Sequence, residues 1–276
     1  IDLRRLDDAL IAFKDALIHN PDYHESLNSL GVTLFKTGDH TEAIRVLKKA
    51  IKVKPDFVEA YLNLSEILKQ IDQRDEAKEC LRNAIQVNPD VADIHNNLGA
   101  IFYADEFFEE SIKCFKKAIK IDPKLADIYN NLGNAFKDIE LFEEAMKSYE
   151  KAIELEPNSA EIHNNFGSLL SENLSRHDDA IISFKKAISL DLYFYPAHLN
   201  LGHTFVALNQ YESAVEAYKS TMTIKPDLGN ILGNLLNAKM NCCNWEKYNS
   251  LLNIKNIKKE FLDGKKVIAP FFLLSL

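Results

Sequence analysis

Six asparagines recur along the chain at intervals of 34 or 35 residues. A carboxamide side chain carries both donors and an acceptor, so it can bond the N–H and the C=O of an extended polypeptide whatever side chains that polypeptide bears. The row therefore predicts a surface that binds polypeptide backbone. The alternative is that each amide bonds a neighbouring helix and holds one structural unit to the next. We call this set the asparagine row: Asn63, Asn97, Asn131, Asn165, Asn200 and Asn234.

Acidic residues stand four positions before members of this row, which is about one turn of a helix, so both sets share one helix face. Carboxylates at the edge of a peptide groove would select basic or Ser/Thr-rich segments. The alternative is that they sit in the first helical turn because the helix dipole favours negative charge there. We call them the acidic margin: Glu59, Asp93, Asp127 and Glu161, with Glu25 continuing the pattern before Ser29.

Residue patterns for catalysis are absent from the sequence. It contains no glycine-rich phosphate loop, no G-x-S-x-G and no H-E-x-x-H. His95, His163 and His198 recur at one repeat position, but no cysteine or carboxylate stands at ligand spacing on the same face, so we expect packing residues rather than metal ligands. We therefore predict no catalytic residue, no metal and no cofactor in this chain.

Composition and charge limit the partners. The 276 residues are 46% hydrophobic and carry a net charge of −8, which disfavours a general nucleic-acid binder because such a protein needs a basic stripe. No apolar run reaches the roughly 18 residues of a membrane span. Cys80 and Cys114 lie 34 residues apart, and Cys242 and Cys243 are adjacent, which favours free thiols in a reducing compartment. With no signal peptide visible, we expect a cytoplasmic protein without membrane or nucleic-acid partners.

The elements that position these residues form a repeat. The segment Ala126-Asp-Ile-Tyr-Asn-Asn-Leu-Gly-Asn-Ala-Phe136 matches the chain again 34 residues upstream and downstream, and prolines keep the same period. Within one copy, Tyr129, Leu132, Gly133 and Phe136 make the i, i+3, i+4, i+7 stripe of an amphipathic helix, and a second such helix follows. Two helices of about 14 residues therefore fill each unit. Gly133 is most easily explained by a close approach of two helix backbones.

This pattern of aromatic, Leu, Gly, aromatic, then Ala, aromatic, Ala and Pro resembles the tetratricopeptide repeat (TPR) over nearly the whole chain. The resemblance implies an all-α, right-handed superhelical solenoid of antiparallel helix pairs. One unit carries an extra residue within the turn 171–179, where we expect a local irregularity that leaves the stack intact. The expected units are residues 1–23 (the second helix of a truncated repeat), 24–57, 58–91, 92–125, 126–159, 160–194 (with the insertion), 195–228, 229–262 (a degenerate pair) and 263–276 (the start of a junction to a further domain).

A second resemblance concerns function. The asparagine row is similar to the inner surface of protein O-GlcNAc transferases, and the segments 234–248 and 264–274 resemble the junction to the glycosyltransferase domain in that family, including its bacterial members and the plant SPINDLY-like branch. The family more often has Cys-Asp-Trp where this chain has Cys243-Asn244-Trp245. The resemblance implies a UDP-sugar donor and catalytic residues beyond Leu276, in a longer protein of which this chain is a fragment.

Three hypotheses follow. The first is a superhelix that binds extended or unfolded segments of client proteins in its concave groove and recruits them for an O-GlcNAc transferase-like enzyme. The second is a stand-alone TPR scaffold for the assembly of protein complexes. The third joins the repeats to another enzyme, such as a sulfotransferase or a methyltransferase. A groove for C-terminal carboxylates is disfavoured, because the first helices at 92–104, 160–172 and 195–207 contain no Lys or Arg.

Overall fold

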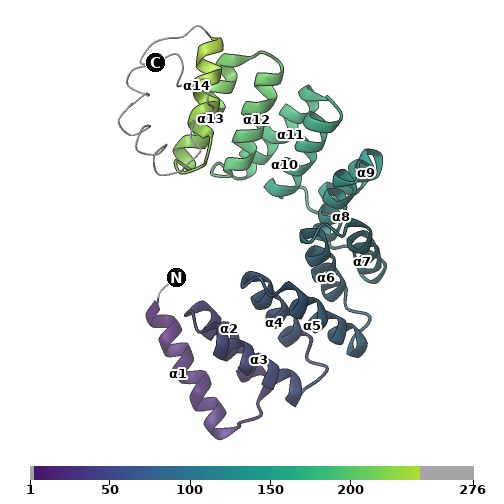
Figure 1. Cartoon of the computed structure of the whole chain (residues 1–276), viewed down its shortest axis with the longest axis vertical. Coiled ribbons are helices and arrows are strands. Elements are labelled where there is room, and N and C mark those ends of the chain that lie inside the picture. Colours follow the sequence, from purple (N-terminus) through teal and green to yellow (C-terminus); the bar gives the residue numbers. More distant parts are fainter. Residues whose placement is uncertain (1–2, 243–276) are drawn as a thin grey trace. The chain divides into compact units, whose positions relative to one another are not determined.

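The computed structural model describes residues 3–242, and these residues form helices without any strand (Figure 1). The chain divides into two compact units, one up to Glu140 and one from Leu141 onward. The first unit holds α1 (Leu3–His19), α2 (His24–Lys36), α3 (His40–Val53), α4 (Val58–Gln70), α5 (Arg74–Val87), α6 (Ala92–Ala104), α7 (Phe108–Ile121) and α8 (Ala126–Asp138). The second holds α9 (Phe142–Leu155), α10 (Ala160–Ser168), the π-helix η1 (Leu169–Asn173), α11 (His177–Leu190), α12 (Tyr195–Ala207), α13 (Tyr211–Ile224) and α14 (Ile231–Asn241).

Helices of two kinds alternate within each unit. We call the even-numbered helices first helices and the odd-numbered ones second helices; the asparagine row lies on the first helices from α4 to α14. Each helix of the first unit packs against the next, and α2, α4, α6 and α8 also contact one another in succession. In the second unit α10 contacts α12 in the same way. First helices therefore lie side by side within each unit, and the predicted all-α repeat fold is confirmed.

A left-handed residue joins the first helix of a pair to the second. At the turn after α6, Glu106 has φ of 63°, and the N–H of Phe107 reaches back to the carbonyl of Phe102 at 2.9 Å. This bond caps the helix end and reverses the chain in a short turn. Equivalent positive φ angles occur at Gly38, Asp72, Glu140, Ser175 and Asn209.

Four first helices, α2, α6, α10 and α12, each carry a glycine that faces a large side chain of the following second helix. A Cβ on Gly99 would lie 2.7 Å from Cε1 of Phe115, and one on Gly202 would lie 2.5 Å from Cε1 of Tyr218. The expected cause was the approach of two backbones. At Gly99 and Gly202 the structure instead places a fully buried ring over the glycine, because glycine leaves the volume that the ring fills.

The extra residue of segment 160–194 lies in a short π-helix. Helix α10 ends at Ser168, and the chain continues as η1 with an N–H of Leu174 bonded to the carbonyl of Leu169 at 3.2 Å. A π-helical turn accommodates one more residue than an α-helical turn. Leu169 and Leu170 remain buried, so the insertion changes the helix locally while its apolar side stays in the core.

Three charged side chains join two successive repeats in the first unit. Asp105, just after α6, accepts from Arg74 and Lys78 of α5, each at 2.9 Å. Lys78 also contacts Asp75 at 2.7 Å. The Asp105 and Lys78 side chains are only 17% and 12% exposed, so this cluster is partly shielded from water.

Residues 243–276 lie outside the part of the chain that the structure describes. The expected second helix of segment 229–262, with Trp245, Tyr248 and Leu252, therefore stays a prediction, as does the junction at 263–276. The described part of segment 229–262 contains α14.

Candidate peptide-binding face

Every member of the asparagine row lies on a first helix and is half-buried. Asn63, Asn97 and Asn131 stand on α4, α6 and α8 of the first unit. Asn165, Asn200 and Asn234 stand on α10, α12 and α14 of the second. Each unit thus presents its own part of the row on adjacent helices. The use of these residues for peptide binding stays a prediction.

In the first unit, two members of the row bond backwards to the preceding repeat. The Nδ2 of Asn63 donates to Oδ1 of Asn28 at 2.9 Å, and the Nδ2 of Asn131 donates to Oδ1 of Asn96 at 3.1 Å. The acceptor in each case is the residue just before the row position of the preceding repeat. These bonds hold the amides in fixed orientations and connect adjacent first helices.

The second unit repeats this pairing with one change. The Nδ2 of Asn200 donates to Oδ1 of Asn164 at 3.0 Å, across the same pair of positions. In the next repeat the equivalent acceptor position holds Leu199, which has no polar side chain. Asn234 instead lies 3.2 Å from Nε2 of His203, a residue one helical turn further along α12.

Asn97 differs from these paired asparagines. Its expected acceptor position is occupied by Leu62, which packs against the apolar core. Glu66, one turn further along α4, already bonds Lys69 and Gln70. Within residues 3–242, Asn97 forms no hydrogen bond through its side chain, so its donors and acceptor are all available to a ligand.

The period of 34 residues reveals the row, but it does not reveal which atoms accept hydrogen bonds from it. Asn28, Asn96 and Asn164 form a second line of asparagines, and Asn28 and Asn164 are only 7% exposed. The dipeptides Asn96-Asn97 and Asn164-Asn165 were the available signal. A paired row residue donates one side-chain N–H to its neighbour and retains its other N–H and its oxygen. The pairing therefore joins adjacent repeats and still leaves hydrogen-bonding groups for a polypeptide.

The acidic margin is exposed to solvent. Glu59, Asp93, Asp127 and Glu161 all lie in the first turn of their helices, and none of them forms an ion pair with another described residue. The helix dipole favours this location, as the alternative interpretation requires. The carboxylates are also free to meet positive charges on a ligand.

The three recurrent histidines bond the turn between repeats. The Nε2 of His95, His163 and His198 lies 2.9, 3.0 and 3.2 Å from the carbonyl oxygens of Pro89, Pro157 and Leu192, respectively. Each contact spans six residues, from the turn into the following first helix. Within residues 3–242 no group of three or more His, Cys, Asp or Glu side chains is arranged to hold a metal ion.

A tyrosine and an aspartate link two first helices beside the row. The hydroxyl of Tyr103 on α6 donates to Oδ2 of Asp138 on α8. Burial, followed by this contact with the carboxylate, raises the pKa of Tyr103 well above its usual range, so the phenol stays protonated at neutral pH. It can therefore donate a hydrogen bond but cannot act as a base.

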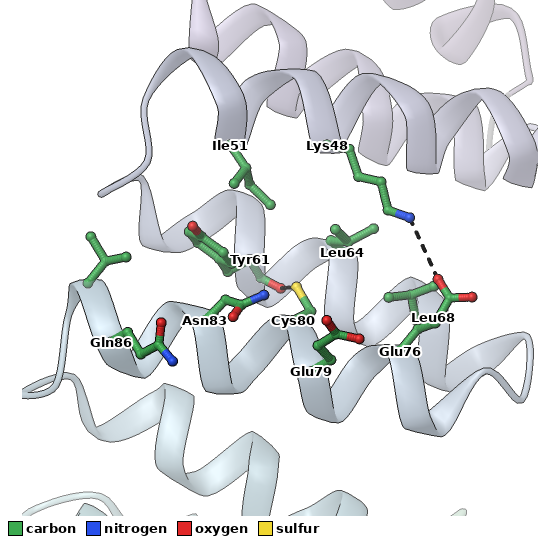
Figure 2. A pocket seen from close by; sticks show the side chains of 11 residues that line it. Lys48, Ile51, Tyr61, Leu64, Leu68, Glu76, Glu79, Cys80, Asn83 and Gln86 are labelled. Carbon is green, nitrogen blue, oxygen red and sulfur yellow. Dashed lines mark hydrogen bonds and ion pairs between the residues drawn. The ribbon is translucent and has the colours of Figure 1, made fainter.

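The first unit also contains a cavity of about 450 Å³ between the second helices α3 and α5 (Figure 2). Tyr61, Leu64 and Leu68 of α4 form its floor, and the thiol of Cys80 points to the carbonyl oxygen of Tyr61 at 3.7 Å. Burial raises the pKa of the Cys80 thiol to about 12. A protonated, buried thiol is a poor nucleophile, so this cavity is not a catalytic site based on cysteine.

No helix in the described part of the chain combines the length and the apolar character that a membrane crossing requires. The search of curated proteins gave no significant match to this sequence.

Solved structures share the fold. YrrB, described as a TPR protein with an unusual peptide-binding site, aligns with 24% identity and a TM-score of 0.53 over 70% of this chain and 97% of that one. The Cut9–Hcn1 hetero-tetramer of the APC/C gives a TM-score of 0.71 with 14% identity, over 84% of this chain and 46% of that chain. PilF of Pseudomonas aeruginosa gives 0.65 with 17% identity, over 79% and 96%.

Family profiles of the tetratricopeptide repeat match successive parts of the sequence and together cover more than half of it. The matched ranges are residues 1–56, 34–101, 108–139, 126–159, 148–182 and 197–232. These matches, the helix pairs and the neighbours in known structures agree on one conclusion. The chain belongs to the tetratricopeptide repeat family.

Proposed function

We propose that the first helices bind an extended polypeptide segment through the asparagine row. The observation that carries this proposal is the arrangement of the amides. Three of them are oriented by a partner in the preceding repeat and keep an oxygen and an N–H, and Asn97 keeps all its groups. Oriented amides lose less side-chain entropy on binding than free ones. YrrB offers a precedent within the fold, since its description names a peptide-binding site.

The more specific form of the proposal is that this chain recruits substrates for a protein O-GlcNAc transferase-like glycosyltransferase in the cytoplasm. The asparagine row supports it, together with the sequence resemblance of residues 234–248 and 264–274 to the junction of that family. In this form a UDP-sugar and the catalytic residues belong to a domain that follows residue 276. Extended or unfolded segments of client proteins would be the partners.

A stand-alone TPR scaffold is the second candidate function. It is favoured by the same pairing of amides, because those bonds already explain why asparagine recurs without any enzyme attached. Sequencing the gene past the codon for Leu276 separates the two. A domain of alternating strands and helices with a nucleotide-sugar site supports the transferase form, and a nearby stop codon supports the scaffold.

Peptide binding itself is tested by changing Asn97, Asn131 and Asn165 together to alanine. The ligand is a fluorescein-labelled, Ser/Thr-rich peptide of 20 residues, and the readout is fluorescence anisotropy. We expect about a tenfold or greater loss of affinity, because several hydrogen bonds of about 1 kcal/mol each are removed. The matched control changes the exposed asparagines Asn20, Asn83 and Asn158 to alanine and should bind as the wild type does. Equal affinity in all three proteins would show that the row is structural only.

A further inference from the structure

Helix α7 carries a stripe of lysines that the peptide-binding face does not use. Lys113, Lys116, Lys117 and Lys120 are all exposed and lie at i, i+3, i+4 and i+7 on one side of the helix, and Lys124 follows in the next turn. At 1.5 Å of rise per residue, the four helical lysines extend over about 10 Å. The acidic residues of α7, Glu109 and Glu110, stand in its first turn, at the other end.

None of these five lysines forms an ion pair within the described part of the chain. The ammonium of Lys116 lies 5.2 Å from the centre of the Phe136 ring, which is a cation–π contact and not an ion pair. Helix α3 has basic residues at equivalent repeat positions, yet there Arg45 pairs with Glu42, Lys48 with Glu76 and Lys49 with Asp22. The stripe therefore has no ion-pair partner among the described residues, although the protein carries a net charge of −8.

A positive side chain of the neighbouring second helix extends the stripe. Arg82 of α5 is exposed, and its guanidinium lies 5.9 Å from the ring centre of Phe102. Burial raises the pKa of the Cys114 thiol on α7; the charges of Lys117, Arg82 and Lys113 oppose that shift, and the charge of Glu110 adds to it. Arg82 of α5 thus acts on the same thiol as two lysines of the stripe.

The surroundings of the stripe narrow the class of ligand. Membrane-surface helices place large apolar residues beside their lysines, and the exposed side of α7 between residues 113 and 120 has none. Single-stranded nucleic acids require aromatic side chains on which bases stack, and none is exposed there either. Carboxylates on a helix or an extended segment repeat about every 6 Å, which matches the spacing of Lys113 and Lys117.

We propose that the lysine stripe of α7, extended by Arg82, docks an acidic segment of a partner protein. The expected mode is charge complementarity, which speeds association and selects the partner more than it adds affinity. This surface lies on a second helix, so it is separate from the asparagine row. A partner could occupy it while an extended polypeptide occupies the first helices of the same unit.

The test uses a fluorescein-labelled peptide of 14 residues with glutamates at i, i+3, i+4 and i+7, and a matched peptide with glutamines in their place. Anisotropy in about 0.1 M salt should detect only the acidic peptide. The variant Lys113→Gln, Lys117→Gln, Lys120→Gln should weaken its binding about tenfold or more, and glutamine preserves helix propensity. The control Lys52→Gln, Lys185→Gln, Lys186→Gln removes the same charge from α3 and α11, outside the stripe. It should weaken binding less than about twofold, because at about 0.1 M salt an exposed charge acts over only about 10 Å.

Equal loss in the two triple variants would overturn the proposal, since the attraction would then be non-specific. Lysine-dependent binding of phosphatidylserine vesicles or single-stranded DNA that is tighter than binding of the acidic peptide would overturn it as well. A second measurement does not rely on variants. Carbodiimide cross-linking of the acidic peptide to the wild-type chain should join it to Lys113, Lys116, Lys117 or Lys120, and cross-links confined to other lysines would contradict the docking site.

Discussion

The residues with positive φ at the turns between helices are strained where they are not glycine. Glu106 is exposed and has φ of 63°, a conformation in which an L-residue with a Cβ is strained by about 1–2 kcal/mol. The same position in the first complete repeat holds Gly38, with φ of 93°. Glycine adopts this region freely, so the position is governed by backbone geometry rather than by side-chain contacts.

Replacement of Glu106 by glycine should therefore stabilise the protein. We expect a gain of about 0.5–1 kcal/mol, because the relief of strain exceeds the extra entropy of the unfolded chain. Urea denaturation followed by circular dichroism measures it. The control Glu109→Gly, on the exposed first turn of α7, should lose stability, and a loss at Glu106 as large as at Glu109 would contradict the argument.

The asparagine row divides into paired and unpaired residues, and the two kinds should respond differently to alanine. Asn63→Ala removes a hydrogen bond to Asn28 and should cost about 0.5–1.5 kcal/mol of stability. Asn97→Ala removes no bond within the described chain, and alanine is the better helix former, so its stability should stay equal or rise. Thermal melts of the two variants compare them directly. A cost at Asn97 as large as at Asn63 would show that its amide has a structural partner.

Between elements, the charged cluster around Asp105 holds two repeats together. Hydrogen bonds from Lys78, and then from Arg74, hold the pKa of Asp105 below its usual range. A carboxylate with a lowered pKa in the folded state contributes stability above its unfolded pKa, near 3.9, and this contribution is lost as pH falls through the folded value. The cluster thus stabilises the contact between α5 and the turn after α6 at neutral pH.

The variant Asp105→Asn should lose about 1–2 kcal/mol of stability at pH 7, because it removes the charge from two charge-assisted hydrogen bonds. The difference from wild type should remain constant from pH 7 to about 5 and shrink as the pH approaches 3. Denaturant titrations across this range measure it. Asp75→Asn, at a side chain that is 98% exposed, serves as the control and should change stability little. A pH-independent difference at Asp105 would rule out the electrostatic explanation.

Across the whole molecule, the sequence predicted the all-α repeat fold because a period of 34 residues reports directly on stacked helix pairs. The row was visible for the same reason. The acceptors of its amides were not predicted, since the bond from Asn131 to Asn96 depends on the offset between two helices that a single helical pattern does not contain. The packing of Phe115 over Gly99 was missed for a similar reason, because the relevant neighbour belongs to another helix.

On this proposal, the asparagine row recognises polypeptide backbone rather than side chains. The most direct measurement compares the affinity of the wild-type chain for one Ser/Thr-rich peptide, its scrambled version and a version with N-methyl groups on alternate backbone nitrogens. Backbone recognition predicts nearly equal dissociation constants for the first two peptides and about a tenfold or greater loss of affinity for the third. N-methylation removes backbone N–H groups of the peptide, which would donate hydrogen bonds to the asparagine side-chain oxygens. Unchanged binding of the N-methylated peptide, together with loss on scrambling, would contradict the account.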